Sequence, residues 1–451
     1  MIRKAIMVPH PPIALAEVGR GEEKKIQQTL DAYGEACSFI ADDHPDTVII
    51  LSPHALMYRD YFNISGGKDA YGDMARFHAG RVAFRKEYDT EFVSCLTQML
   101  EEEGFPGGTQ YDRDPLLDHG TMVPLYFLTP YLPDCRIVRI GLSGLPLSMH
   151  YRLGMYIQKT AETLGRHIAV IASGDLAHCQ KEDGPYGYKA EGPAYDEAIM
   201  KTMGTAAFNE LFDYPASFLH ASMECGHRAF VILAGILDGL SVTPHVLSHE
   251  ATFGVGYGIV TFDIGSADNE RHFLDQHRAV HSSDPLVQLA VQAAAYSVRT
   301  GKTMPVPSAL PASLQKPAGC FVSVHEDGDL RGCIGTIFPV HDTLAEEIVN
   351  NARSACLRDP RFSAITEDEL PFLEISVDVM GEPEVIHDRS QLDVHRYGII
   401  CTSKNRRGLL LPDLEGVDTV EQQIAIACSK GGFDPDEEDL VIERFEAVRH
   451  V

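Results

Sequence analysis

Tryptophan is absent from the 451 residues, and other shortages restrict the function more than this one does. No apolar run is long enough to span a bilayer, and prolines from Pro9 onward interrupt the apolar core that a signal peptide would need. Lysine and arginine number only 38 against 65 aspartates and glutamates, which gives a net charge of −27. Because a polyanion binds a basic surface, we expect neither nucleic acid nor a membrane as a partner.

Cysteine pairs with the C-x-x-C spacing are also missing, since the ten cysteines are scattered along the chain. This excludes the usual pattern of a zinc ribbon and gives no sign of a disulfide framework. Reduced thiols are typical of the cytoplasm, so we expect a cytoplasmic protein. The sequence leaves open whether copies of the chain form a homo-oligomer.

The chain has more residues than one hydrophobic core usually holds, so two domains are expected. Residues 1–265 alternate strand-like and helical segments, which predicts an α/β domain with a sheet sandwiched by helices. Strands are expected at 2–8, 47–51, 136–140, 167–172 and 258–262, and helices at 23–42, 88–103, 148–164, 195–203 and 228–240. The polar residues 266–283 read as a linker, and residues 284–451 predict a second domain of the α+β class.

Two histidines follow predicted strands of the first domain directly. His10 comes after the strand at 2–8 and His54 after the strand at 47–51, and each is flanked by proline, which stiffens the loop. A third strand-like run ends in the Ser-Gly-Asp-Leu-Ala-His segment of residues 173–178. The carboxyl ends of strands form the ligand crevice of α/β sheets, so these imidazoles predict a metal or acid–base site. A single loop histidine, however, is more often structural.

A third metal ligand is expected just before the predicted helix 228–240. Glu224 would complete the set of two histidines and one carboxylate that holds non-haem Fe(II). Cys225 and His227 are rival ligands, and Cys225 would shift the preference towards zinc. Taken alone, Glu224 can also be an ordinary carboxylate at a helix N-terminus, where the helix dipole stabilises it.

Two further histidines have the surroundings of acid–base groups. His119 precedes a small-residue turn and an apolar helix, and His178 ends the segment that begins at Ser173. Either can act as a general base or position oxygen, because imidazole titrates near neutral pH.

The motifs of residues 1–265 together resemble the class III extradiol ring-cleavage dioxygenases of the LigB-like superfamily. They are Pro-His-Pro-Pro (9–12), Ser-Pro-His (52–54), Asp-His-Gly-Thr (118–121), Ser-Gly-Asp-Leu-Ala-His (173–178) and Glu-Cys-Gly (224–226), in the family's order. The resemblance implies Fe(II) held by His10, His54 and Glu224, with His178 as the acid–base residue and His119 beside substrate and dioxygen. The superfamily includes the Memo-like proteins, in which a cysteine is expected at the third ligand position; Glu224 favours the dioxygenase branch, and Cys225 leaves the alignment open by one residue.

The second domain carries a Leu-Arg-Gly-Cys-Ile-Gly motif at residues 330–335, next to a predicted hairpin turn. Cys333 is either a buried small thiol or a nucleophile. Arg331 could hold an anion, and we expect it to line a groove with Cys333 or to meet a carboxylate, because an unpaired buried guanidinium is costly. The motif, with matching segments at 351–355, 359–362, 408–412 and 422–431, resembles the AMMECR1 domain. That resemblance implies a fold and an association with Memo-like and radical-SAM proteins in a modification pathway.

These observations favour a non-haem Fe(II) dioxygenase, with zinc as the alternative metal. Its partners would be dioxygen and a small aromatic substrate of the catechol or aminophenol class, opened by extradiol cleavage. One alternative is a Memo-like metal-binding or redox protein that works with a radical-SAM partner. A second alternative is a non-enzymatic two-domain scaffold.

Overall fold

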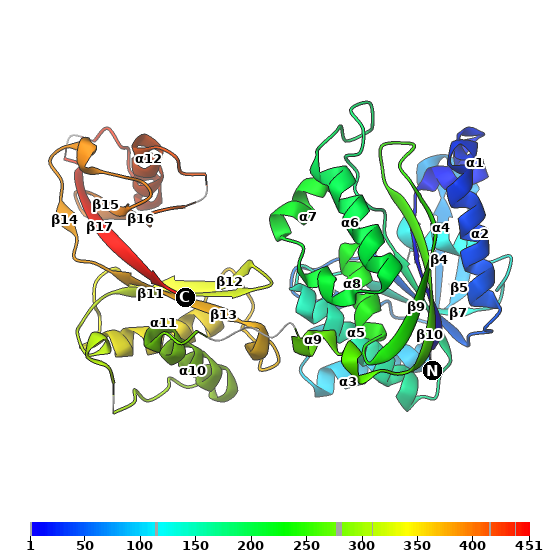
Figure 1. The fold of residues 1–451 in the computed structure, drawn as a ribbon, viewed down its shortest axis with the longest axis horizontal. Helices are drawn as coiled ribbons and strands as arrows, with labels where there is room; N and C mark the ends of the chain where they lie inside the picture. The colour runs from blue at the N-terminus through cyan, green and yellow to red at the C-terminus, as the bar shows by residue number, and fades with distance from the viewer. Residues whose placement is uncertain (1, 113–115, 277–281, 309, 415, 438) are drawn as a thin grey trace. The chain divides into compact units, whose positions relative to one another are not determined.

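A mixed sheet of six strands forms the centre of the first of two units, Met1–Arg278 and Ala279–Val451 (Figure 1). The computed structural model describes residues 2–451 except 113–115, 277–281, 309, 415 and 438. The strand order is β7 (Arg136–Gly141), β2 (Thr47–Ser52), β8 (Ile168–Ser173), β1 (Ile2–Val8), β10 (Tyr257–Ala267) and β9 (Leu240–Glu250). The first four strands are parallel; β10 pairs antiparallel with β1, and β9 pairs antiparallel with β10.

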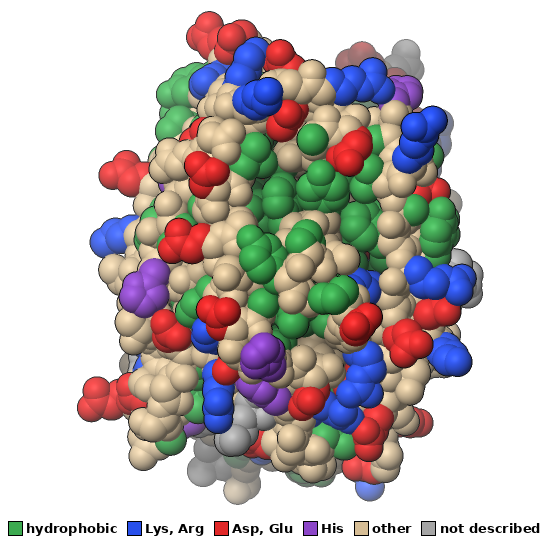
Figure 2. All heavy atoms as spheres, turned by 90° about the vertical axis from the view of Figure 1, so that its right-hand side faces the viewer, with side chains coloured by type: hydrophobic (Ala, Val, Ile, Leu, Met, Phe, Trp, Pro, Cys, Tyr) green, Lys and Arg blue, Asp and Glu red, His purple; other side chains and the backbone are tan. Residues whose placement is uncertain are grey.

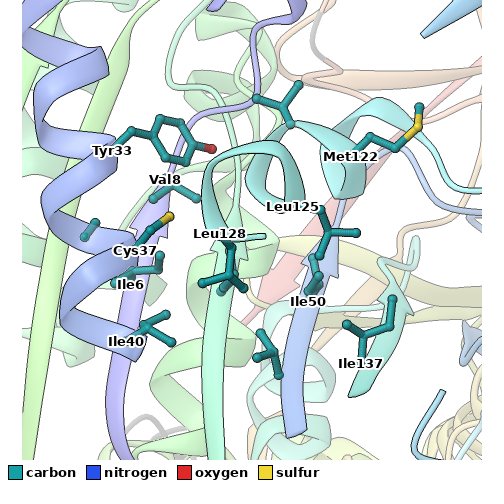
Figure 3. Packing of buried hydrophobic residues seen from close by; sticks show 14 of the residues in the cluster. Ile6, Val8, Tyr33, Cys37, Ile40, Ile50, Met122, Leu125, Leu128 and Ile137 are labelled. Atoms are coloured by element: carbon teal, nitrogen blue, oxygen red, sulfur yellow. The ribbon is translucent and has the colours of Figure 1, made fainter. Parts of the chain in front are cut away.

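Helices cover both faces of this sheet, as an α/β pattern requires. On one face lie α2 (Gln27–Ala41) and α4 (His119–Leu128), whose apolar side chains meet those of β1 and β2 in a buried cluster (Figure 3). On the other face α8 (His227–Ile236) packs on β8 and against α5 (Leu147–Thr163). The remaining elements of this unit are α1 (Ala16–Gly19), β3 (Phe62–Asn63), β4 (Asp69–Met74), β5 (Ala79–Glu87), α3 (Thr90–Glu102), β6 (Gly107–Gly108), α6 (Glu191–Thr205), α7 (Ala216–Ser222) and α9 (Phe273–Gln276).

The second unit is built on a separate antiparallel sheet, with its own buried clusters. Its strands follow the order β12 (Asp329–Gly335), β11 (Cys320–Glu326), β13 (Glu374–Met380), β17 (Val441–His450), β15 (Tyr397–Ser403) and β16 (Arg406–Leu410), and β14 (Glu384–Val385) pairs with β17. Its helices are α10 (Pro285–Thr300), α11 (Leu344–Leu357) and α12 (Val420–Gly431). The side chain of Asp284 accepts a hydrogen bond from the Leu286 backbone and caps α10, and Pro285 takes the first position of the helix, where no N–H is needed. The expected α/β class with a second α+β domain is thus confirmed.

The segment predicted as a linker, residues 266–283, is partly structured. Strand β10 continues to Ala267, and α9 follows it. The His272 imidazole pairs with Asp238 (Nδ1 to Oδ2, 2.6 Å), and Gly239 donates a backbone hydrogen bond to Arg271. This part therefore packs on the first unit, whereas residues 277–281 of the predicted linker lie outside the described residues.

On the surface of the first unit, hydrophobic side chains gather in the middle of one face and charged side chains surround them (Figure 2). Within the described part of the chain, no helix combines the length and apolar character needed to cross a bilayer.

Candidate metal centre

The ends of three neighbouring parallel strands place His10 and His54 opposite each other. Strand β8 lies between β1 and β2, so the loops after β1 and β2 leave the same edge of the sheet. The Nε2 atoms of His10 and His54 are 3.0 Å apart, and their rings lie nearly perpendicular, at 86°. The structure thus brings together the two histidines that the sequence places after strands.

His119 reaches the same edge from the first turn of α4. Asp118 caps this helix by accepting from the Thr121 backbone (3.0 Å), and it also accepts from the Ser52 hydroxyl at the end of β2 (2.6 Å). This shared carboxylate fixes the start of α4 against β2. The His119 ring consequently stacks on His54, with the ring centres 4.0 Å apart.

One ring nitrogen from each of His10, His54 and His119 lies within 4.8 Å of the others. Burial is the main cause that lowers the pKa of all three imidazoles: that of His119 falls to about 3, and that of His10 falls well below its usual value. The rings are therefore neutral at pH 7, and each has a nitrogen lone pair that can bind a metal ion.

The Glu224 carboxylate, expected as the third ligand, is directed elsewhere. Its Oε2 accepts a hydrogen bond of 2.6 Å from the His227 backbone and satisfies an N–H group at the start of α8. The neighbouring thiol of Cys225 lies 3.7 Å from His10 Nε2. Among the described residues, the imidazole cluster therefore consists of His10, His54 and His119, with Cys225 beside it. Glu224 binds the N-terminus of α8, which is the structural alternative that the sequence analysis gave for it. A ligand role for Glu224 stays a prediction.

His227, the other rival ligand, has both ring nitrogens engaged away from this cluster. Its Nε2 lies 2.9 Å from the carbonyl oxygen of Leu211, and its Nδ1 lies 3.3 Å from the Tyr195 hydroxyl. His227 is the first residue of α8, and its side chain is fully buried. His227 thus has a structural environment.

His178 has the environment of a base without a partner. Its Nε2 is buried, and no described residue forms a hydrogen bond with it. The imidazole stacks on Tyr186, with ring centres 5.2 Å apart, and burial lowers its pKa although the charge of Asp175 opposes this effect. A neutral imidazole with a free buried nitrogen can accept a proton from a bound molecule.

Tyr186 was not identified from the sequence, although the Gly-Pro-Tyr-Gly-Tyr segment at 184–188 marks an unusual loop. The Tyr186 side chain is 53% exposed, yet it covers the His178 ring. Gly184 packs closely on Gly254, which holds this loop against the turn before β10. Tyr186 therefore shields the imidazole from water on one side.

The donor atoms of the centre fit a transition-metal ion. Neutral imidazoles and a nearby thiol are ligands for zinc, iron or copper, whereas magnesium and calcium prefer oxygen ligands. Whichever of these metals binds, His10 and His54 are the candidates to hold it. Further ligands could come from His119, Cys225 and Glu224.

In the second unit, Arg331 meets a carboxylate, which is one of the two environments expected for it. Its Nε donates to Glu369 Oε1 at 2.7 Å, and both side chains are almost fully buried. Cys333 lies two residues further along β12, half-buried, where its sulfur accepts from the Ser323 hydroxyl at 3.2 Å. Because Arg331 points into the second unit, only Cys333 of this pair is accessible.

Comparisons with known proteins agree with this division. Residues 4–260 match a family described as the catalytic LigB subunit of aromatic ring-opening dioxygenase, and residues 287–450 match the AMMECR1 family. Protein CA_C1420 of Clostridium acetobutylicum is 38% identical over 98% of both chains. A protein of Thermotoga maritima is 44% identical over 37% of this chain and 97% of its own length. An uncharacterized protein of known structure from Pyrococcus horikoshii is 31% identical, covers 36% of this chain and 88% of that one, and has a TM-score of 0.35.

Proposed function

Since the chain belongs to the family of the catalytic LigB subunit of aromatic ring-opening dioxygenases, we propose that its first domain is an Fe(II)-dependent dioxygenase. Its substrate would be a small aromatic molecule with adjacent hydroxyl or amino groups, opened by extradiol cleavage. The observation that carries this proposal is the convergence of three imidazole nitrogens within 4.8 Å at the carboxyl edge of the sheet.

The residues around the centre divide the chemical work. When bound, the metal supplies orientation, Lewis acidity and electron transfer between the substrate and dioxygen. His10 and His54 hold it, and His178 accepts a substrate proton at its buried Nε2. His119, stacked on His54, borders the space in which substrate and dioxygen would bind. Tyr186 keeps water away from the His178 ring.

A Memo-like metal-binding or redox protein is the second candidate, and one observation favours it. The Cys225 thiol lies near His10, at the position where a carboxylate ligand was expected, and Glu224 is turned towards α8. In this case the thiol would complete the metal site, with zinc as the alternative metal. A radical-SAM protein would then be the partner in a modification pathway, with the AMMECR1 domain in the same chain.

Anaerobic purification, metal analysis and oxygen uptake with catechol and 2-aminophenol test the proposal. We expect one iron ion per chain and oxygen uptake that depends on one of these substrates. A protein that binds iron but consumes no oxygen with any ring of this class would overturn the dioxygenase and leave the Memo-like candidate. Failure to bind any transition metal would contradict both the dioxygenase and the Memo-like candidate. The non-enzymatic two-domain scaffold would then be the remaining alternative.

A further inference from the structure

Ser173, the last residue of β8, is fully buried between the loop that carries His10 and the first turn of α4, which carries His119. Its Oγ is 2.6 Å from the carbonyl oxygen of Gly120 and 2.9 Å from Nδ1 of His10. A carbonyl oxygen can only accept, so the single hydroxyl proton of Ser173 is donated to Gly120. The Ser173 oxygen is then an acceptor for His10, and Nδ1 of His10 must carry a proton.

We propose that Ser173 is a positioning residue that fixes His10 as the Nδ1–H tautomer and so directs the Nε2 lone pair to the metal ion. The inference rests on the proposed metal centre. A neutral imidazole has two tautomers, and only the one with an unprotonated Nε2 can bind a metal through that atom. The Nε2 atom faces His54 Nε2 at 3.0 Å, the side on which the donor atoms converge.

The surroundings of His10 leave little freedom for the other tautomer. His10 is 1% exposed, so bulk water cannot take the place of the Ser173 oxygen. Its backbone N–H is also held, because it donates to Asp175 Oδ1 at 2.7 Å. Ser173 at the end of β8 and Asp175 just after it therefore hold the ring and the backbone of His10. Such partners of metal-binding histidines set the orientation and basicity of the ligand.

The same hydroxyl links His10 to the start of α4. Gly120 follows His119, and a Cβ at Gly120 would lie 2.5 Å from the Ser52 oxygen, so only glycine allows this approach. Loss of the Ser173 hydroxyl would leave the Gly120 carbonyl and His10 Nδ1 without their partner at once. Ser173 thus acts on the metal centre without touching the ion.

The test reads the tautomer directly by 15N NMR of histidine-labelled full-length protein, free of metal and loaded with Zn(II) as a diamagnetic probe. We expect His10 of the wild-type protein to carry its proton on Nδ1 in both samples. In Ser173→Ala the Nδ1 preference should be lost, and affinity for Fe(II), measured anaerobically by chelator competition, should fall by roughly 10- to 100-fold. Ser173→Thr keeps the hydroxyl and should restore both readouts.

Ser248→Ala is the matched control, since Ser248 is a buried serine of the first unit whose hydroxyl has no hydrogen-bond partner among the described residues. It should change neither readout. A wild-type His10 protonated on Nε2 in the metal-free protein overturns the inference, and this holds even if Ser173→Ala does not fold. A folded Ser173→Ala with wild-type Fe(II) affinity overturns it too. A wild-type protein that binds no metal instead removes the proposed function, whatever the tautomer.

Discussion

At the scale of single residues, one turn determines which side chain lies next to His10. Met223 adopts a left-handed backbone conformation, with φ of 57°, at the end of α7. The chain then presents the Cys225 thiol to His10 and leaves the Glu224 carboxylate at the N-terminus of α8. Spacing in the sequence cannot show which of the adjacent residues Glu224 and Cys225 lies next to His10, because this depends on the directions in which their side chains leave the turn.

Removing single donor atoms identifies the ligands. We expect His54→Ala to lose most of the bound iron, because two remaining donors rarely hold Fe(II) against water. Cys225→Ser should lower iron occupancy more than Glu224→Gln does, since only the thiol borders His10. Metal analysis after dialysis against a weak chelator measures all three. Greater loss in Glu224→Gln would show that the carboxylate turns to the ion on binding.

His178 is predicted to transfer a proton and to leave metal binding alone. His178→Ala should keep the iron and reduce turnover by roughly 10²- to 10⁴-fold, the usual effect of removing a general base. Steady-state oxygen uptake measures the turnover of the variant, and metal analysis of the same sample measures its iron content. If the iron is lost as well, His178 is a ligand and not a base.

At the scale of elements, continuous apolar runs were sufficient to predict the parallel strands that place the site. Strands β1, β2 and β8 are buried on both faces, so their sequences consist mainly of apolar residues. The β4–β5 hairpin was missed because β4 is short and only half-buried and most residues of β5 are exposed or half-exposed, and β9 was missed because it is a mostly half-exposed edge strand. The family resemblance places His119 near the site, but its convergence with His10 and His54 as a possible third donor nitrogen was not predicted, since it depends on the capping of α4 by Asp118 against β2.

A buried histidine in the first turn of α5 makes the stability of the first unit depend on pH. His150 is fully buried there; Ser143 donates its backbone N–H to Nε2, and Nδ1 lies 2.9 Å from the Pro146 carbonyl oxygen. Burial, with the charge of Arg228, lowers the pKa of His150 to about 3. Protonation would place a hydrogen on Nε2 of His150, so that two N–H donors would face each other where the Ser143 N–H now donates to Nε2.

The unfolded chain takes up this proton near its usual pKa of about 6.5, and the folded chain does not. Stability from this group is therefore complete above that pH and falls as the pH drops from about 6.5 towards 3, by about 2 kcal/mol between pH 6.5 and pH 5. Urea unfolding at both pH values should show a smaller loss for His150→Gln than for wild type. Equal losses in the two proteins would contradict the assignment.

At the scale of the whole molecule, each of the two units has its own buried clusters and its own candidate functional residues. The imidazole cluster belongs to Met1–Arg278, and the buried Arg331–Glu369 pair belongs to Ala279–Val451. The Thermotoga maritima relative matches 37% of this chain over 97% of its own length, so a part of this size exists as a separate protein. The net charge of −27 favours the approach of metal cations over that of anions at low ionic strength.

We therefore predict that a chain ending at residue 283 folds and binds iron with the affinity of the full-length protein. The first unit has its own sheet and its own buried clusters, so its core does not depend on the residues removed. Arg331→Ala in the full-length protein is the companion variant, because it leaves the buried Glu369 charge unpaired and should destabilise the second unit by roughly 3–5 kcal/mol. Urea unfolding of that variant should show one transition shifted to lower urea, with iron affinity unchanged. Loss of iron in either protein would mean that the metal centre depends on the second unit.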